Sequence, residues 1–160
     1  MLNKILTSKK KNILFIIITC FLLLLTSCVT ITDDEQKFVD KLYEQQTGKI
    51  TGLVVDLRIR GTEAKEPHTF SENHISGAKS FDVSQDEDFS SWIKKLSNNK
   101  VTIFIVDSGN NEYVEIVDIL KELGYKDIVV YTKGYEHLRT TTAFTEAIYE
   151  GQGLDDCGCE

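Results

Sequence analysis

Three cysteines lie where a thiol could do chemistry: Cys28, Cys157 and Cys159. The last two form a Cys-Gly-Cys pair at the acidic C-terminus. Two thiols this close could form a strained disulfide, bind a soft metal or carry sulfur. The neighbouring acids would raise the thiol pKa values, and a metal would need further ligands. An inert or merely oxidised pair is therefore the alternative, and we expect neither a metal nor a cofactor.

A second polar cluster directly follows an apolar run over residues 101–106. It reads Asp107, Ser108, Gly109, Asn110, Asn111 and Glu112. Its two carboxylates could form an acidic cup for a cation or an amine, and the alternative is a solvated acidic loop. Backbone N–H groups at the start of a helix favour a charged carboxylate. We therefore expect Asp107 to be ionised.

Short apolar runs and apolar residues at helical spacing predict the elements that position these residues. Buried strands are expected at 53–57, 101–106 and 128–131. Helices are expected at 34–46, at 89–96 behind a capping box of Ser84 and Glu87, at 110–123 and from 134 onward. Gly124 is placed to end the third of these helices. The polar stretch 58–74, with the only proline, predicts a loop.

Strands that alternate with helices predict one α/β domain, with a central, mainly parallel sheet flanked by helices on both faces. We place this domain at residues 34–149. Residues 28–33 are expected to form a short tether. The glycine-containing acidic stretch 150–160 is expected to be a flexible tail.

The N-terminus has the pattern of a secretory signal over residues 1–27. Lysines precede an apolar run from Ile13 to Leu25, which is too short to span a membrane comfortably. Leu25-Thr26-Ser27-Cys28 then resembles the bacterial lipobox, whose cysteine receives a lipid with acyl chains such as palmitate. This predicts a lipid-anchored chain on the extracytoplasmic face of the cell membrane, or on an outer membrane in a cell that has two. The alternative is an uncleaved anchor with an ordinary Cys28 thiol.

The charge of the chain excludes some partners. Without the signal, 14 basic residues remain against 25 acidic ones, a net charge of −11. Such a surface repels phosphate backbones, so no nucleic acid is expected to bind. We expect attachment to the membrane to come from the lipid and not from a basic patch.

Three stretches together resemble the rhodanese-like (sulfurtransferase) family over roughly residues 34–140. The first is Leu53-Val54-Val55-Asp56-Leu57-Arg58, similar to a strand that ends in Asp-x-Arg. The second is the stretch 70–78, which contains His74-Ile75-Ser76-Gly77-Ala78. The third joins Leu123-Gly124-Tyr125 to the run 129–134. We expect Asp56 and Arg58 to form a structural polar pair, His74 to hold its loop by hydrogen bonds, and Gly77 and Ala78 to allow close backbone approach at a strand start.

The resemblance implies a reactive cysteine at the start of the loop after the central strand, where it would hold sulfur as a persulfide. Asp107 stands at that position, and a carboxylate cannot hold a sulfane sulfur. Gly109 also lies one position early. We therefore expect a degenerate active site in a docking module that binds an unidentified protein or small molecule at its cleft. The alternative is a sulfurtransferase or thiol-redox enzyme that works through Cys157 and Cys159.

Overall fold

A computed structural model describes residues 28–61, 67–85 and 88–151. These residues form a five-stranded sheet with the strand order β1-β6-β5-β2-β4, in which every neighbouring pair is parallel. Its strands are β1 (Cys28–Thr32), β6 (Asp127–Tyr131), β5 (Thr102–Val106), β2 (Gly52–Asp56) and β4 (Lys79–Ser80). A second, two-stranded ribbon pairs β3 (His74–Ile75) with β7 (Glu150–Gly151) in antiparallel fashion. The predicted α/β fold with a mainly parallel sheet is confirmed.

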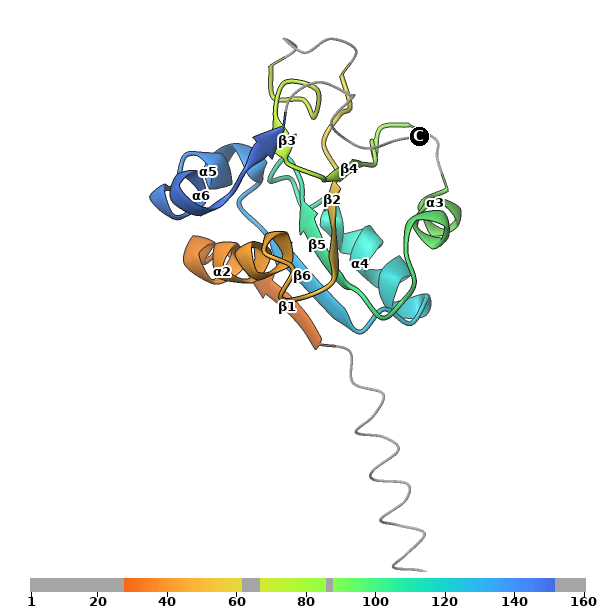
Figure 1. Ribbon diagram of the computed structural model, residues 1–160. Coiled ribbons are helices and arrows are strands. Elements are labelled where there is room, and N and C mark those ends of the chain that lie inside the picture. The colour runs from red at the N-terminus through yellow and green to blue at the C-terminus, as the bar shows by residue number, and fades with distance from the viewer. Residues whose placement is uncertain (1–27, 62–66, 86–87, 152–160) are drawn as a thin grey trace, which may run out of the picture.

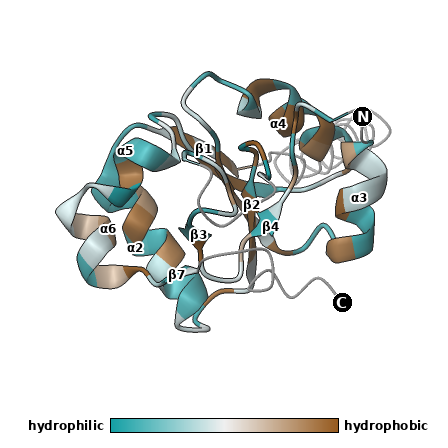
Figure 2. Cartoon of the chain, turned by 90° about the horizontal axis from the view of Figure 1, so that it is seen from above, coloured by the Kyte–Doolittle hydropathy of each residue, from teal (hydrophilic) through white to brown (hydrophobic). Residues whose placement is uncertain are grey.

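Helices cover both faces of this sheet (Figure 1). On one side lie α2 (Glu35–Gln46), α5 (Tyr135–Arg139) and α6 (Thr142–Ala147). On the other lie α3 (Phe89–Leu96) and α4 (Tyr113–Glu122). Buried hydrophobic residues of these helices pack with those of the sheet in two cores, and Figure 2 shows the hydrophobic residues of the helices and strands in brown, seen from above.

Successive strand residues point to opposite faces, so each central strand contributes to two cores. Phe104 of β5 packs in the core under α2, whereas Ile103 and Ile105 pack in the core under α3 and α4. The same alternation places Val54 and Val55 of β2 in different cores. Because both faces are covered, these strands are apolar throughout, and that is why the sequence identified them.

The helix ends show where local sequence signals were right. Asp34 caps α2 by accepting a hydrogen bond from the Lys37 amide at 3.1 Å. Gly124 follows the end of α4 as predicted, and its amide donates to the Lys121 carbonyl at 2.9 Å. The proposed capping box is wrong: α3 begins at Phe89 and is capped by Asp88, while Ser84 donates to Asp82.

Two expected boundaries differ from the structure. The stretch 28–33, expected to be a tether, is mostly strand β1, which pairs residue for residue with β6 from Cys28↔Asp127 to Thr32↔Tyr131. Glu150 and Gly151, expected to open the flexible tail, pair with Ile75 and His74. Both segments find their partners at distant positions of the chain, so no local pattern identifies them. The remainder of the tail, 152–160, lies outside the described residues.

Within the described ranges, no helix combines the length and the apolar character that crossing a membrane requires.

Candidate functional site

The acidic loop 107–112 connects β5, the middle strand of the sheet, to α4. It therefore lies at the edge where the parallel strands end, which is the usual place for ligand sites in open α/β sheets. Ser108, Asn110 and Asn111 are exposed at this edge, whereas Asp107 is completely buried.

The Asp107 carboxylate points back into its own loop. Its Oδ1 accepts a hydrogen bond from the Gly109 amide at 2.8 Å. Its Oδ2 is buried and has no hydrogen-bond partner within the described part of the chain. One side of the carboxylate is thus satisfied by the loop, and the other is left without a donor.

Burial raises the pKa of Asp107 to about 6, against the opposing effect of the Gly109 amide and with a further rise from Glu112. The Gly109 amide favours the ionised form, as expected, but burial has the larger and opposite effect on the pKa. Loss of hydration outweighs the donors that the loop supplies. Asp107 consequently binds its proton in the mildly acidic range.

Glu112 is the second carboxylate of the loop and is held by polar groups. It accepts a short hydrogen bond from the Ser108 hydroxyl and one from the Asn110 amide at 3.3 Å. Partial burial would raise the pKa of Glu112, but the bond from Ser108 and the other donors around it lower that pKa below its usual range. The loop therefore carries one ionised carboxylate at its surface above a second that titrates near pH 6.

Gly134, the residue before α5, closes the loop from the β6 side. Its φ is +79° and its ψ is 158°, a conformation open essentially to glycine alone. A Cβ here would lie 2.7 Å from the Gly109 nitrogen and 2.7 Å from the Ser108 carbonyl carbon. The Tyr135 amide also donates to the Asp107 carbonyl at 2.8 Å. The loop is thus fixed by backbone contacts at its first turn.

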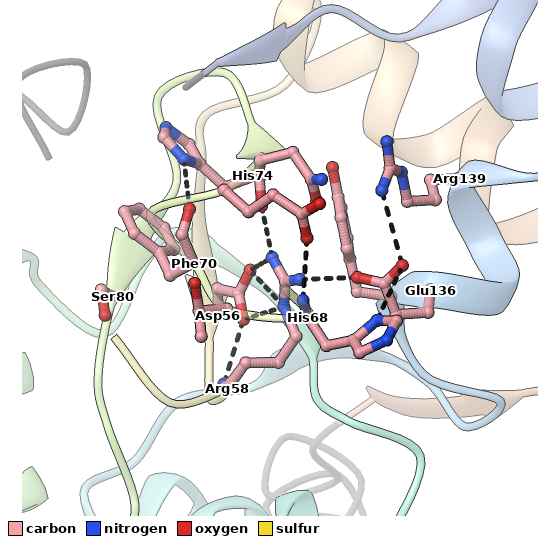
Figure 3. Close-up of polar contacts among 12 residues, drawn as sticks. Asp56, Arg58, His68, Phe70, His74, Ser80, Glu136 and Arg139 are labelled. Carbon is pink, nitrogen blue, oxygen red and sulfur yellow. Dashed lines mark hydrogen bonds and ion pairs between the residues drawn. The ribbon is translucent and has the colours of Figure 1, made fainter. Parts of the chain in front are cut away.

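A buried ion pair lies beside the loop, at the end of β2 (Figure 3). Arg58 contacts Asp56 with both sides of its guanidinium, at 3.0 Å from Nε to Oδ1 and 2.8 Å from Nη2 to Oδ2. Both side chains are at most 1 % exposed. Arg58 also donates to the Asn73 carbonyl at 2.6 Å, which ties the strand end to the loop that follows.

The same guanidinium reaches the start of α5. It contacts Glu136 at 3.1 Å and lies 3.9 Å from the centre of the Tyr135 ring. Burial would lower the pKa of Arg58, but Asp56 and the neighbouring groups raise it, so Arg58 stays charged. Tyr135 in turn donates to Glu150 of β7 at 2.6 Å. This cluster joins β2, α5 and β7, and it has a structural role.

The motif around His74 packs mainly inside the domain, with His74, Ile75 and Ala78 buried. His74 is buried, stacks on Phe70 with ring centres 4.0 Å apart, and contacts the Phe70 carbonyl through Nδ1 at 3.0 Å. Gly77 has a φ of +76° in the turn closed by the Ala78 amide on the Ile75 carbonyl. A Cβ on Gly77 would meet nothing within 4 Å, so the turn needs its φ and not the close approach that we expected. Ala78 is fully buried.

One group of side chains has the composition of a metal site. Ligand atoms of His68, Glu72 and Glu136 lie within 4.8 Å of one another. Glu136 is already paired with Arg58 at 3.1 Å and with Arg139 at 3.5 Å. The charges of Arg58 and Arg139 oppose the binding of a metal ion at Glu136. The ion pairs with these two arginines account for the position of Glu136 without a metal.

A groove opens next to the acidic loop, between α3 and α4. Its volume is about 470 Å³. Apolar residues that include Phe81, Val83 and Ile116 line it, and three acids, Asp88, Glu112 and Glu115, stand among them. The groove thus combines an apolar lining with negative charge.

Among the described residues the only cysteine is Cys28, and it lies apart from this site. Cys28 is exposed at the start of β1, at the opposite edge of the sheet. Cys157 and Cys159 fall outside the described residues. The sequence predicted that Asp56 and Arg58 form a pair. It did not predict that Tyr135, Glu136 and Glu150 are their neighbours. The Arg58–Glu136 contact spans 78 residues, so no spacing signal could have indicated it.

The chain thus has a parallel α/β fold, and its candidate site is the loop that follows the central strand. The Rhodanese-like domain family matches residues 38–140, which is more than half of the sequence. The chain therefore belongs to the rhodanese-like family. Among curated proteins, none matches the sequence significantly.

Solved structures show the same fold. The crystal structure of the Alr3790 protein from Anabaena sp. superposes with a TM-score of 0.53 at 13% identity, and the match covers 72% of this chain and 91% of that one. The solution structure of the rhodanese-like domain from the same Anabaena protein gives a TM-score of 0.52 at 14% identity, with 76% and 82% covered. At these identities the likeness concerns the fold alone.

Proposed function

We propose that this chain is a lipid-anchored protein on the extracytoplasmic face of the cell membrane, whose rhodanese-like domain binds a ligand and does not transfer sulfur. The observation that carries the proposal is the buried Asp107 at the position where the family's reactive cysteine is expected. The anchor is supported by the lipobox-like run that ends at Cys28 and by the exposure of that residue.

With Asp107 at this position, the loop cannot transfer sulfur, for two reasons. A carboxylate oxygen is a poor nucleophile toward sulfur and cannot hold a sulfane sulfur as a persulfide. The charge of Glu112, joined by that of Asp107 above about pH 6, also repels anionic donors such as thiosulfate. The loop therefore keeps its shape but lacks the atom that would accept sulfur.

The groove between α3 and α4 indicates what the domain binds. A ligand with a positive group and an apolar body would satisfy the acids Asp88, Glu112 and Glu115 and cover the apolar lining. We therefore propose a cationic, partly apolar ligand, such as a basic segment of a partner protein.

The absence of sulfur transfer is tested on the full mature chain by mass spectrometry after exposure to thiosulfate or a persulfide donor. Release of thiocyanate from cyanide is measured in parallel. We expect no adduct and no turnover. Adducts and turnover that vanish in Cys157→Ser/Cys159→Ser would overturn the proposal and make the C-terminal pair the active site. Asp107→Cys then asks whether the loop still supports sulfur binding.

Ligand binding is tested by an NMR titration with a short amidated peptide of alternating leucine and lysine, beside its leucine–glutamate counterpart. We expect shifts around the groove with the lysine peptide alone, and weaker binding in Glu112→Gln/Glu115→Gln. Glu146→Gln, an exposed acid on α6 at the other face, is the matched control. Equal binding of the two peptides would contradict the proposed ligand class.

The anchor is tested by the intact mass of the protein extracted from its own membrane. We expect a mature chain that begins at Cys28 and carries acyl groups, and a Cys28→Ala variant without them.

A further inference from the structure

The structure leaves no spacer between Cys28 and the folded domain. Cys28 is the first residue of β1 and pairs with Asp127, and its amide donates to the Lys126 carbonyl at 2.5 Å. Because neighbouring strands are parallel, the edge where β1 begins is also the edge where β6, β5 and β2 begin, at the bottom of Figure 1. A lipid on Cys28 would hold this edge at the membrane surface.

Lysines occupy the loops of this edge. The loops that lead into three of the strands each carry one exposed lysine: Lys49 before β2, Lys100 before β5 and Lys126 before β6. The loops 47–51, 97–101 and 123–126 contain no acidic residue. In a chain with a net charge of −7, three neighbouring loops that carry only positive charge are a local exception.

The helices add to this positive edge, because they run opposite to the strands and end near it. The last turn of α3 carries Lys94 and Lys95, and that of α4 carries Lys121. The acids in the same region are fewer, namely Glu44, Asp118, Glu122 and Asp127, and Asp118 pairs with Lys121 at 3.1 Å. Asp127 is already engaged, since it accepts from Thr102 at 2.6 Å and lies 4.0 Å from Lys41.

The opposite edge of the sheet is acidic. The segments that follow the strands carry the acids Asp33, Asp34, Glu35, Asp82, Asp88, Asp107, Glu112 and Glu136, against the bases Arg58, Arg60 and Lys133. Charge is therefore separated along the strand direction, over roughly 17 Å for a five-residue strand. An anionic surface attracts one edge of this domain and repels the other.

We propose, on the basis of the lipid anchor proposed above, that the lysine-bearing edge lies directly on the membrane and binds the phosphates of anionic lipids. A hollow of about 400 Å³ opens at this edge and is lined by Asn99, Lys100, Val101, Gly124, Lys126 and Asp127. It places two lysines and an amide around a space that can admit a headgroup. The acidic loop 107–112 then faces away from the membrane, where a partner can reach it.

On this proposal, attachment does not depend on the lipid alone. The negative net charge of the chain does not reveal this basic edge, because most of the described acidic residues lie at the opposite edge of the sheet. Each lysine near an anionic surface strengthens attachment about fivefold. The lipid supplies the anchor, and the lysines fix the orientation of the domain upon it.

The test uses the lipidated mature chain in vesicles of phosphatidylglycerol and phosphatidylcholine, in phosphatidylcholine vesicles, and in detergent. Lysines are labelled with an amine-reactive reagent and read by mass spectrometry. In the anionic vesicles we expect Lys49, Lys100 and Lys126 to be protected at least about fivefold relative to detergent. Lys37 and Lys133, exposed at the acidic edge, serve as internal controls and should label equally in all three.

Charge reversal distinguishes the contribution of the lysines to protection from that of the lipid anchor. Lys49→Glu/Lys100→Glu should abolish the protection of Lys126, whereas the matched reversal Lys37→Glu/Lys133→Glu should leave it intact. Protection that survives the first variant would overturn the role of the lysines. Equal labelling of both edges in a chain whose mass confirms the lipid would overturn this inference alone. A chain that carries no lipid at Cys28 would overturn both this inference and the proposed anchor.

Discussion

At the scale of single residues, Asp107 shows how burial can outweigh local hydrogen bonding. Its Oδ1 receives the Gly109 amide, but its Oδ2 has no donor among the described residues, and the pKa rises to about 6. The sequence placed this carboxylate correctly at the end of the central strand. It could not show that the loop would turn the side chain inward, because that depends on the packing of Gly134 from a distant segment.

This raised pKa predicts that Asp107 makes stability depend on pH. Because the folded pKa lies above the unfolded value, the native state holds the proton more tightly, so stability should fall as the pH rises from about 4 to about 6. Asp107→Asn removes this titration and replaces the unsatisfied Oδ2 by an amide nitrogen that can donate to the neighbouring Glu112 carboxylate. We expect the variant to gain about 1–2 kcal/mol at pH 7 and nothing at pH 4, by urea unfolding.

Glu112→Gln is the control for that experiment, since it removes the neighbouring charge and leaves Asp107 in place. It should keep the dependence on pH but move it to lower values. An Asp107→Asn variant that loses stability at pH 7 would show that the buried carboxylate is ionised and stabilised by its loop.

Arg58 makes the second prediction at this scale. Arg58→Ala would leave the Asp56 carboxylate buried without its partner, and such a loss costs about 3–5 kcal/mol. Arg139→Ala removes the other cation that contacts Glu136, but its side chain is 31% exposed, so we expect a loss of at most about 1 kcal/mol. Thermal unfolding at constant pH compares the two, and similar losses would contradict the structural role given to the buried pair.

At the scale of the elements, the sequence predicted best those that are apolar on both faces or carry local caps. Strands β2, β5 and β6 and helices α2 and α4 were found from such patterns. The short strands β3, β4 and β7 were missed because two residues carry no periodicity, and α6 was not resolved from α5. What these short elements have in common is that distant contacts define them.

The contact between α5 and the acidic loop gives a prediction at this scale. Gly134 and Gly77 both have a positive φ, but a Cβ on Gly134 would strike backbone at 2.7 Å, whereas one on Gly77 would meet nothing within 4 Å. Gly77→Ala should cost about 1–2 kcal/mol for its backbone conformation alone. Gly134→Ala should cost at least about 2 kcal/mol more, measured by urea unfolding. Equal costs would mean that the loop yields freely to the added methyl group.

At the scale of the whole molecule, the chain separates its charges between two edges of one sheet. The edge where the strands begin carries Cys28 and the lysine-bearing loops, and the edge where they end carries the acidic loop. Composition alone gave the net charge but not this separation, because the direction of each strand must be known before its loops can be assigned to an edge. The parallel order of the strands supplies that information.

The difference between a tether and β1 decides whether this arrangement is rigid. A tether would let the domain turn freely above the membrane, whereas β1 contributes a ladder to β6, and Thr32 of this strand is buried. Replacing residues 29–33 by a glycine–serine segment of equal length should therefore cost roughly 2–5 kcal/mol, from several hydrogen bonds and the lost apolar contact.

Urea unfolding gives that cost, and hydrogen exchange of the β6 amides 128–131 locates it, since the exposed edge should lose protection there first. Ile31→Thr, at a side chain that is 52% exposed, is the control and should change stability by less than about 0.5 kcal/mol. An unchanged unfolding midpoint in the glycine–serine chain would make residues 28–33 the tether that their sequence suggests. The domain would then be free to turn on its anchor, and the lysine-bearing edge would have no fixed place at the membrane.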